Sequence, residues 1–181
     1  GPGAVHSVAY DFDSDEQMEL FINSSEGSKK MFDLDTGELE WEVDISDPGH
    51  SYNGVVLNYP GISRPDNDSP MSVVIGGSTG SLTSHRATDG EVLWRTCLVN
   101  GDQLPLDTEA PDLANNCNGG LLSDISIGNL IGDPDSLEDP NEIAVGSTDG
   151  FLYLIDPVDG EMIWSFDMGA PVGAPVLGSP T

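Results

Sequence analysis

The sequence is poor in positive charge. Its 181 residues include five Lys and Arg against 32 Asp and Glu, a formal net charge of −27. Nucleic acids and anionic lipid headgroups both recruit proteins through Lys and Arg, so the composition excludes them as partners. The acidity has two interpretations that the composition leaves open. It suits a surface adapted to a salty medium, and it also suits a supply of carboxylates for divalent cations.

Long hydrophobic runs and catalytic motifs are missing too. No apolar stretch approaches the ~20 residues that a membrane-spanning helix needs. The three histidines, His6, His50 and His85, lie on separate segments without a Cys or acidic partner at a known catalytic spacing. The sequence contains neither a G-x-S-x-G motif nor a G-x-x-x-x-G-K-[ST] loop. We therefore expect a protein that is not an enzyme.

What the sequence does contain is a threefold repeat. The three tryptophans, Trp41, Trp94 and Trp164, each end a Gly-Glu-x-x-Trp motif, and another Gly precedes each motif by ten positions. Short β-prone runs alternate with Asp-Gly and similar turns, as in Glu142–Gly146, Phe151–Ile155 and Met162–Phe166. A further short strand is predicted before each copy, at Val5–Tyr10, Gly54–Asn58 and Leu121–Ile127. Four antiparallel strands per repeat are typical of a β-propeller blade.

The predicted fold is therefore all-β, with three four-stranded antiparallel blades and the first strand of a fourth. The expected boundaries are 4–47 for blade 1, 48–100 for blade 2, 101–120 for an inter-blade loop, 121–168 for blade 3, and 169–181 for the first strand of the next blade. Closed propellers usually have 4–8 blades. We expect these blades to belong to a larger ring, or other chains to complete one.

The repeat resembles that of PQQ-like (quinoprotein-like) β-propellers. The third copy, Gly150-Phe151-Leu152-Tyr153-Leu154-Ile155-Asp156 followed by Gly160-Glu161 and Trp164, is the best match. The strand that enters each copy resembles instead the integrin-type FG-GAP repeat, in which a calcium loop precedes the strand. Tyr10 to Leu20 fits this second pattern. Because one superfold hosts many functions, the resemblance predicts architecture more strongly than activity.

One loop has the composition of a calcium site. Asp11, Asp13, Asp15 and Glu19 place carboxylates at alternate positions, and Ca²⁺ takes 6–8 oxygen ligands. The FG-GAP resemblance implies a carbonyl ligand at Gln17. It also implies a Gly after the third acid, where this chain has Glu16. The alternative is an acidic loop without an ion. In blade 3, Asn129, Asp133 and Glu142 form a weaker second candidate.

The only two cysteines are predicted to form a disulfide. Cys97 and Cys117 flank the long connection between blades 2 and 3, and a bridge would remove roughly 3 kcal/mol of loop entropy from the denatured state. Two buried free thiols are the alternative. A disulfide indicates an oxidising compartment, so we expect an extracellular, cell-surface or periplasmic location.

The three tryptophans are interpreted as anchors that pack each blade against the next, with sugar stacking as the alternative. We expect a calcium-stabilised binding or scaffold segment whose partners are a protein, a glycan, or propeller blades from the same or another chain. The rival hypotheses are a fragment of a propeller enzyme, either a PQQ-type dehydrogenase or a polysaccharide-degrading enzyme, and an envelope-assembly scaffold. PQQ itself is not expected, because the chain lacks an adjacent Cys pair and a full ring.

Overall fold

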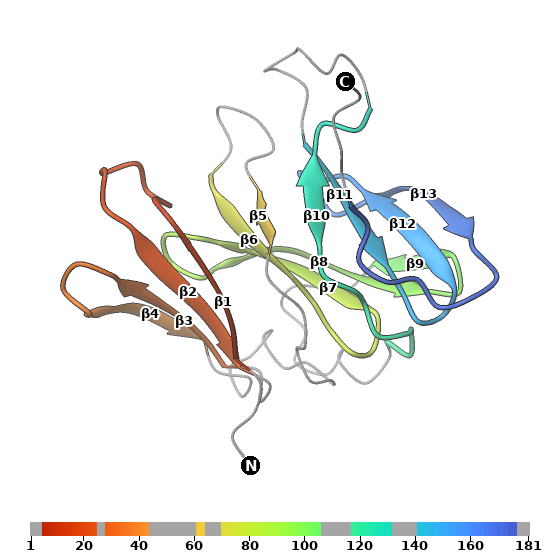
Figure 1. The fold of residues 1–181 in the computed structure, drawn as a ribbon, viewed down its shortest axis with the longest axis horizontal. Helices are drawn as coiled ribbons and strands as arrows, with labels where there is room; N and C mark the ends of the chain where they lie inside the picture. Colours follow the sequence, from red (N-terminus) through yellow and green to blue (C-terminus); the bar gives the residue numbers. More distant parts are fainter. Residues whose placement is uncertain are drawn as a thin grey trace.

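The computed structural model describes residues 5–24, 28–43, 61–63, 70–105, 117–131 and 141–176. Within these segments every regular element is a β-strand, and the strands form three antiparallel sheets that follow one another across the molecule (Figure 1). Each sheet is a blade, so the all-β propeller architecture is confirmed. The described part of the chain has no helix that could cross a membrane.

Blade 1 has four strands in sequential order, with Trp41 on the last of them. These are β1 (Val5–Tyr10), β2 (Glu19–Ser24), β3 (Lys29–Asp33) and β4 (Leu39–Val43). Strand β2 alternates buried and half-buried side chains, as expected for a strand whose two faces have different surroundings. The predicted strand at 5–10 is confirmed.

Blade 2 has five strands, one more than predicted. They are β5 (Gly61–Ser63), β6 (Ser72–Gly76), β7 (Ser81–Arg86), β8 (Val92–Val99) and β9 (Asp102–Pro105). The strand predicted at 54–58 lies outside the described residues. The fifth strand, β9, falls in the segment predicted to be a loop. It forms because Asn100 (φ 51°) and Gly101 (φ 84°) make a two-residue turn that folds the chain back onto β8.

Blade 3 again has four strands. They are β10 (Ser126–Gly128), β11 (Glu142–Gly146), β12 (Phe151–Ile155) and β13 (Met162–Asp167). Residues 169–176 run on beyond β13 without forming a strand, which differs from the predicted first strand of a fourth blade. They follow the path expected of it, however. The Val172 N–H donates to Ser147 O (2.9 Å), as Leu122 N–H on the way into blade 3 donates to Gly77 O (3.2 Å).

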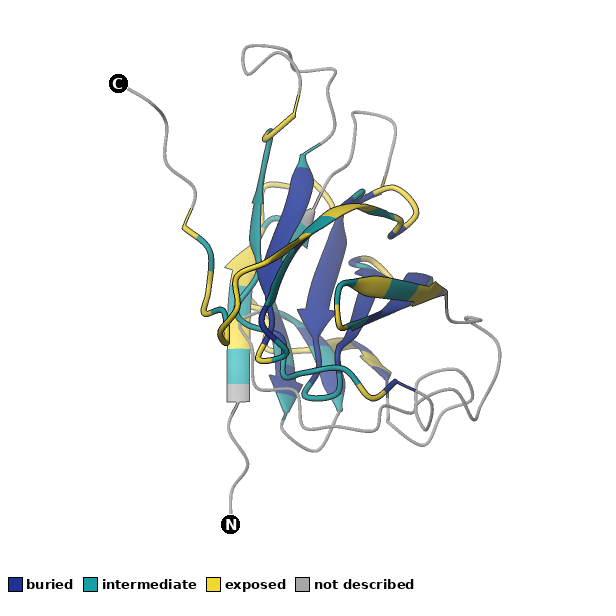
Figure 2. Cartoon of the chain, turned by 90° about the vertical axis from the view of Figure 1, so that its right-hand side faces the viewer, coloured by how far each residue is buried: buried dark blue, intermediate teal, exposed yellow. Residues whose placement is uncertain are grey.

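The hydrophobic core lies between blades. One cluster joins Phe21, Met31 and Trp41 of blade 1 to Val73 and Ile75 of blade 2. A second joins Leu82, Trp94 and Leu98 of blade 2 to Val145, Tyr153 and Ile155 of blade 3. Seen from the blade 3 side, exposed and half-buried segments surround the buried strands (Figure 2). Each blade therefore depends on its neighbour for burial of its apolar face.

Candidate functional site

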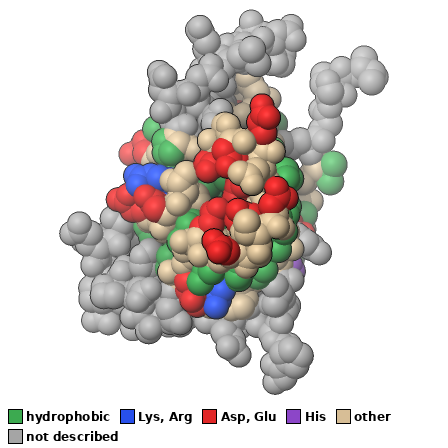
Figure 3. Space-filling view, turned by 90° about the vertical axis from the view of Figure 1, so that its left-hand side faces the viewer, with side chains coloured by type: hydrophobic (Ala, Val, Ile, Leu, Met, Phe, Trp, Pro, Cys, Tyr) green, Lys and Arg blue, Asp and Glu red, His purple; other side chains and the backbone are tan. Residues whose placement is uncertain are grey.

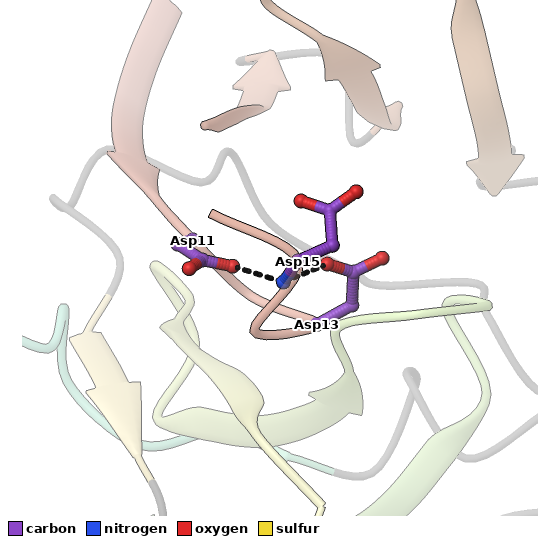
Figure 4. A group of neighbouring side chains, drawn as sticks. All are labelled: Asp11, Asp13 and Asp15. Atoms are coloured by element: carbon purple, nitrogen blue, oxygen red, sulfur yellow. Dashed lines mark hydrogen bonds between the residues drawn. The ribbon is translucent and has the colours of Figure 1, made fainter. Parts of the chain in front are cut away.

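The loop between β1 and β2 brings three aspartates together. Ligand oxygens of Asp11, Asp13 and Asp15 lie within 4.8 Å of one another (Figure 4). The Asp15 N–H donates to Oδ1 of Asp11 (3.1 Å) and of Asp13 (3.2 Å), which wraps the backbone around the carboxylates. Clustered carboxylate oxygens repel one another and form the hard-oxygen ligand set that Ca²⁺ prefers.

The backbone of this loop is left-handed at Glu16, the position where the calcium-loop pattern has a glycine. Glu16 has φ 72° and Ser14 has φ 68°, both in the left-handed region that glycine adopts more easily. Glu16 N–H donates to Asp11 Oδ2 (3.2 Å), and Gln17 N–H donates to Asp15 Oδ1 (2.8 Å). The side-chain amide of Gln17 also donates to Asp15 (2.8 Å). Hydrogen bonds to the aspartates thus hold the strained turn in place.

Glu19, the fourth predicted ligand, has another contact. Its Oε2 accepts the Phe12 N–H at 2.6 Å, and the side chain is buried. Burial raises the pKa of Glu19 above its ordinary value, and the Asp13, Asp15 and Asp11 charges add to this, against the lowering effect of the Phe12 hydrogen bond. The structure therefore gathers three of the four predicted acids and uses Glu19 to fix the base of the loop.

A small acidic pocket lies beside this loop, between blades 1 and 2. It measures about 260 Å³ and is lined by Phe12, Asp13, Glu19, Glu40, Ala87 and Thr88. Burial raises the pKa of Glu40, and the nearby Glu19 and Asp13 charges raise it further. Three carboxylates thus face one pocket whose other wall comes from the β7–β8 turn. Sequence reasoning missed Glu40 because it belongs to a different hairpin from the aspartates.

The weaker second site is only partly described. Glu142 is buried, and its Oε2 accepts the N–H groups of Leu130 (2.6 Å) and Ile131 (3.1 Å). Asn129 lies next to this segment, and Asp133 lies outside the described residues. Glu142 stands in blade 3 where Glu19 stands in blade 1, at the start of the second strand. Both carboxylates hold the preceding loop by its backbone.

Cys97 and Cys117 are joined by a disulfide, with 5.5 Å between their Cα atoms. Cys97 lies on β8 of blade 2, and Cys117 begins the described segment that leads into blade 3. Two residues further on, Gly119 N–H donates to Thr79 O of blade 2 (2.7 Å). The bridge therefore ties the chain that enters blade 3 to the body of blade 2.

Two of the three tryptophans join their blade to the next. Trp41 Nε1–H donates to Ala87 O (2.7 Å), and Trp94 Nε1–H donates to Pro157 O (2.8 Å). Each acceptor residue begins a tight turn of the following blade, three residues before a glycine. Trp164 occupies the same repeat position but is 41% exposed, against 5% for Trp94. No described blade follows it.

A polar network between blades 2 and 3 was not predicted. Gln103 on β9 donates to Gly160 O (2.7 Å) and accepts from Met162 N–H (2.6 Å). Tyr153 OH donates to Asp149 (2.7 Å) and accepts from Gly101 N–H (3.0 Å). Burial alone would raise the pKa of Asp149, but the bonds from Tyr153, Ser147 and two backbone N–H groups hold it below its ordinary value. The Asn100-Gly101 pair, a strong hairpin signal, could have revealed β9.

Carboxylates are frequent at the end of the blades that carries the β1–β2 loop and the β3–β4, β7–β8 and β12–β13 turns. They come from the β1–β2 loop and from the turns that precede the last long strand of each repeat: Asp11, Asp13, Asp15, Asp33, Asp35, Glu38, Asp89, Glu91, Asp156, Asp159 and Glu161. We call this set the acidic end. In the described part of the chain its one cation is Arg86, which is paired with Asp89 (2.8 Å) and with Glu91. Figure 3 shows acidic side chains spread over the blade 1 side, with hydrophobic groups between them.

The two histidines that the structure describes lie in different blades. His6 lies on β1 and His85 on β7, in different blades, and His50 lies outside the described residues. His85 is fully buried, with its Nδ1 3.0 Å from Gly90 O, so it supports the β7–β8 turn.

Comparison with known proteins decides the family. A PQQ-like family model described as outer membrane protein assembly factor BamB matches residues 78–181, more than half of the chain. The chain belongs to this family. The match covers β7 onward, which includes most of blade 2 and all of blade 3. No curated protein matches the sequence.

Solved structures agree with the propeller fold at low sequence identity. BBS1N, crystallised in complex with ARL6DN, is 13% identical with a TM-score of 0.63. The superposition covers 98% of this chain and 48% of BBS1N. Sqt1 from Saccharomyces cerevisiae is 12% identical with a TM-score of 0.64, and the superposition covers 96% of this chain and 41% of Sqt1. BamB from Moraxella catarrhalis is 16% identical with a TM-score of 0.47, and the superposition covers 83% of this chain and 34% of BamB. The chain thus spans between about a third and a half of these proteins.

Proposed function

We propose that this chain is a non-catalytic scaffold segment of a cell-envelope propeller, which binds a protein partner at its acidic end and Ca²⁺ in the β1–β2 loop. Membership of the BamB family supports an envelope scaffold, because that family is described as an assembly factor. The Cys97–Cys117 disulfide supports an oxidising location such as the periplasm. The likeness to BBS1N, solved with ARL6DN, supports a protein as the partner.

The observation that carries the proposal is the acidic end itself. All three blades place carboxylates there, and among the described residues Arg86 alone offsets them. Uncompensated charge of one sign attracts ligands of the other sign and speeds their association. The partner is therefore expected to present Lys and Arg, and its binding should weaken as salt rises. A surface that merely tolerates a salty medium would bind no such partner.

Binding at the acidic end can be tested with a photo-crosslinking amino acid. Val158 lies in the β12–β13 turn at this end and is exposed, while Phe166, near the opposite end of β13, is also exposed and serves as the control. In periplasm-containing extract we expect a crosslinked protein from position 158 and none from position 166. Asp156→Asn with Asp159→Asn should weaken the crosslink. Equal crosslinking at both positions, or no dependence on salt, would contradict the proposed mode of binding.

Calcium binding follows from the three aspartates of the β1–β2 loop. Their oxygens are already gathered, and the backbone carbonyl of Gln17 is the further ligand that the FG-GAP resemblance predicts. A cation there would relieve the mutual repulsion of the carboxylates and offset the conformational cost of the left-handed backbone at Glu16. Bound only by the folded form, it would stabilise blade 1.

Thermal unfolding with and without Ca²⁺ tests this site. At a concentration one hundred times the dissociation constant, the gain in unfolding free energy would be about 2.7 kcal/mol. Asp13→Asn should abolish the shift in Tm. Asp35→Asn, which removes an exposed carboxylate from the β3–β4 turn of the same blade, should leave it intact. A shift of equal size in both variants would point to general screening of charge and would rule out this site.

The non-catalytic role is supported by the contacts that three carboxylates and His85 make. Glu19, His85, Glu142 and Asp149 each contact the backbone of a turn or loop. Incubation with PQQ and Ca²⁺, followed by absorbance and dye-reduction assays, tests the rival dehydrogenase. Reproducible turnover of an alcohol or aldose would overturn the proposal.

A further inference from the structure

The pocket between blades 1 and 2 has both an anionic and an apolar lining. Its volume is about 260 Å³, and Asp13, Glu19 and Glu40 contribute carboxylates to it. Phe12 and Ala87, both buried, contribute apolar surface. A ligand that satisfies both parts of the lining carries a positive charge on an apolar stem, because charge is attracted to the carboxylates and apolar groups lose water against the rest.

Glu19 has one carboxylate oxygen without a donor at this pocket. The side chain is 4% exposed and lines the pocket. Its Oε2 accepts the Phe12 N–H at 2.6 Å, whereas no donor from the described residues contacts the other oxygen. A buried carboxylate is costly to keep charged unless a cation or hydrogen bonds compensate it, and its pKa is accordingly raised by burial. A cation in the pocket would supply the missing compensation.

The partly exposed cations that the structure describes in blades 1 and 2 are paired with other acids. Arg86, at the end of β7, contacts Asp89 (2.8 Å) and Glu91. Lys30 on β3 contacts Glu42 (2.8 Å). No Lys or Arg is found among the described residues that line the pocket. The described part of the chain therefore leaves the charge of the pocket to be balanced by a ligand.

The positions of the carboxylates favour an organic cation over a metal ion. A metal ion binds oxygens that are gathered closely around it. Among the described acids one group of three has its ligand oxygens within 4.8 Å of one another, and neither Glu19 nor Glu40 belongs to it. The pocket carboxylates are thus spread around a larger space, which a charged group with an alkyl stem can fill.

The three carboxylates also come from three different elements, since Asp13 lies in the β1–β2 loop, Glu19 on β2 and Glu40 on β4. An ammonium group directs three N–H donors apart, whereas the donors of a guanidinium lie in one plane and suit a single carboxylate. We propose that this pocket binds a primary alkylammonium group, supplied by a lysine side chain of the protein partner. The source of the group rests on the proposed function, and its chemistry rests on the pocket.

Binding can be measured by NMR titration of the 181-residue chain with acetyl-Gly-Lys-Gly-amide in calcium-free buffer. The amide signals of Phe12, Ala87 and Thr88 should shift and saturate, with a dissociation constant on the order of millimolar because one side chain makes the contact. The norleucine peptide has an alkyl stem of the same length without the charge and should cause no shift at matched ionic strength. Equal shifts with both peptides, or none with the lysine peptide, would overturn the proposal.

Paired variants test whether the pocket carboxylates bind the ammonium group. Glu40→Gln should weaken binding of the lysine peptide about twofold to fivefold, the scale of a contact between partly exposed charges. Glu38→Gln is the control, because Glu38 is exposed two residues away and does not line the pocket. It should leave the dissociation constant unchanged. Equal weakening in both variants would show attraction to net charge and overturn the site, and circular dichroism checks that both variants are folded.

Two further measurements identify the source of the ammonium group. Glu40→Gln should weaken the crosslink from position 158 if a lysine of the partner enters the pocket, and an unchanged crosslink would contradict this source. Cadaverine, a free diamine, should bind no more than about tenfold more tightly than the lysine peptide, and a larger difference would assign the pocket to small amines. A crosslink that persists without any peptide binding overturns the pocket inference alone. Peptide binding without a crosslinked protein contradicts the proposed partner alone.

Discussion

The interface between blades 1 and 2 and that between blades 2 and 3 are built differently around the same tryptophan contact. Both bury an apolar cluster and both contain one indole-to-carbonyl hydrogen bond. The second interface adds β9, whose Gln103 reaches the β12–β13 turn, and the Asp149–Tyr153 network. The first has an acidic pocket at the corresponding place.

This difference indicates how each blade is held. Directional bonds from β9 fix blade 3 relative to blade 2, while blade 1 depends on apolar burial and on Trp41. The pocket between blades 1 and 2 adds carboxylates with raised pKa values, which cost stability near neutral pH. Blade 1 is therefore expected to open before the other two, and a cation in its loop would counteract this.

The largest effect is expected from removing Trp94. Trp94→Ala deletes a buried ring and its hydrogen bond, so it should lower the unfolding free energy by about 3–5 kcal/mol. Trp164→Ala, at the same repeat position but exposed, should cost about 1 kcal/mol or less. Urea unfolding followed by circular dichroism measures both. Equal losses would show that the two tryptophans have equivalent surroundings.

The next effect separates backbone strain from steric overlap. Gly160→Ala places a methyl group against the Trp94 ring, and Gly37→Ala places the same group in open space at nearly the same φ. Strain alone costs roughly 1–2 kcal/mol, and overpacking adds roughly 1–3 kcal/mol at Gly160 only. Chemical unfolding of the two variants measures the losses. A Gly37→Ala loss as large as that of Gly160→Ala would show that overlap with the Trp94 ring adds nothing to the cost of strain.

Much of this architecture could be predicted from the sequence. The spacing of the three tryptophans and the Asp-Gly turns located the last three strands of blade 3 and the first strand of blade 1, because strand and hairpin signals are local. The strand predicted at 121–127 is shorter and begins later, as β10 at Ser126–Gly128. Strand β9, the fifth strand of blade 2, was not predicted, although Asn100-Gly101 is a sequence signal for the hairpin that forms it. A repeat search gives weight to what recurs, and β9 occurs in blade 2 alone among the described blades.

The candidate site was less predictable. The aspartates of the β1–β2 loop were found because their spacing is visible in sequence. Glu40 reaches their pocket from another hairpin of blade 1, and Gln103 acts across blades, so both depend on tertiary placement. The structure also separates Glu19 from the aspartates, since a nearby backbone N–H competes for its carboxylate. The spacing of the acids in the sequence does not reveal whether Glu19 contacts the Phe12 N–H or joins the aspartates.

A moderate effect is expected from removing the hydrogen bonds that distinguish the second interface. Gln103→Ala leaves Gly160 O and Met162 N–H without their side-chain partner, which should cost about 1–3 kcal/mol. Leu104→Ala, on the same strand but exposed, is the matched control and should change little. Hydrogen exchange of blade 3 amides should accelerate in Gln103→Ala only. If it does not, β9 is not what fixes blade 3.

The smallest effect concerns the acidic pocket of the first interface. Because the pKa values of Glu19 and Glu40 are raised, the folded chain binds protons more tightly than the unfolded chain between the ordinary value of 4.5 and the raised ones. Stability therefore falls as pH rises through that window. Asp89 and Asp149, whose pKa values are lowered, titrate below 3.8 and do not contribute there.

Glu40→Gln removes one of these carboxylates and should raise Tm at pH 7.5 more than at pH 5, measured by calorimetry in chelator so that no cation occupies the loop. Glu38→Gln is the control, because Glu38 lies two residues away, is also exposed and does not line the pocket. It changes the net charge by the same amount and should shift Tm equally at both pH values. A larger gain at pH 5 than at pH 7.5 would reverse the sign and show that Glu40 is stabilised in its charged form. The expected result would mark this pocket as the weakest point between blades 1 and 2.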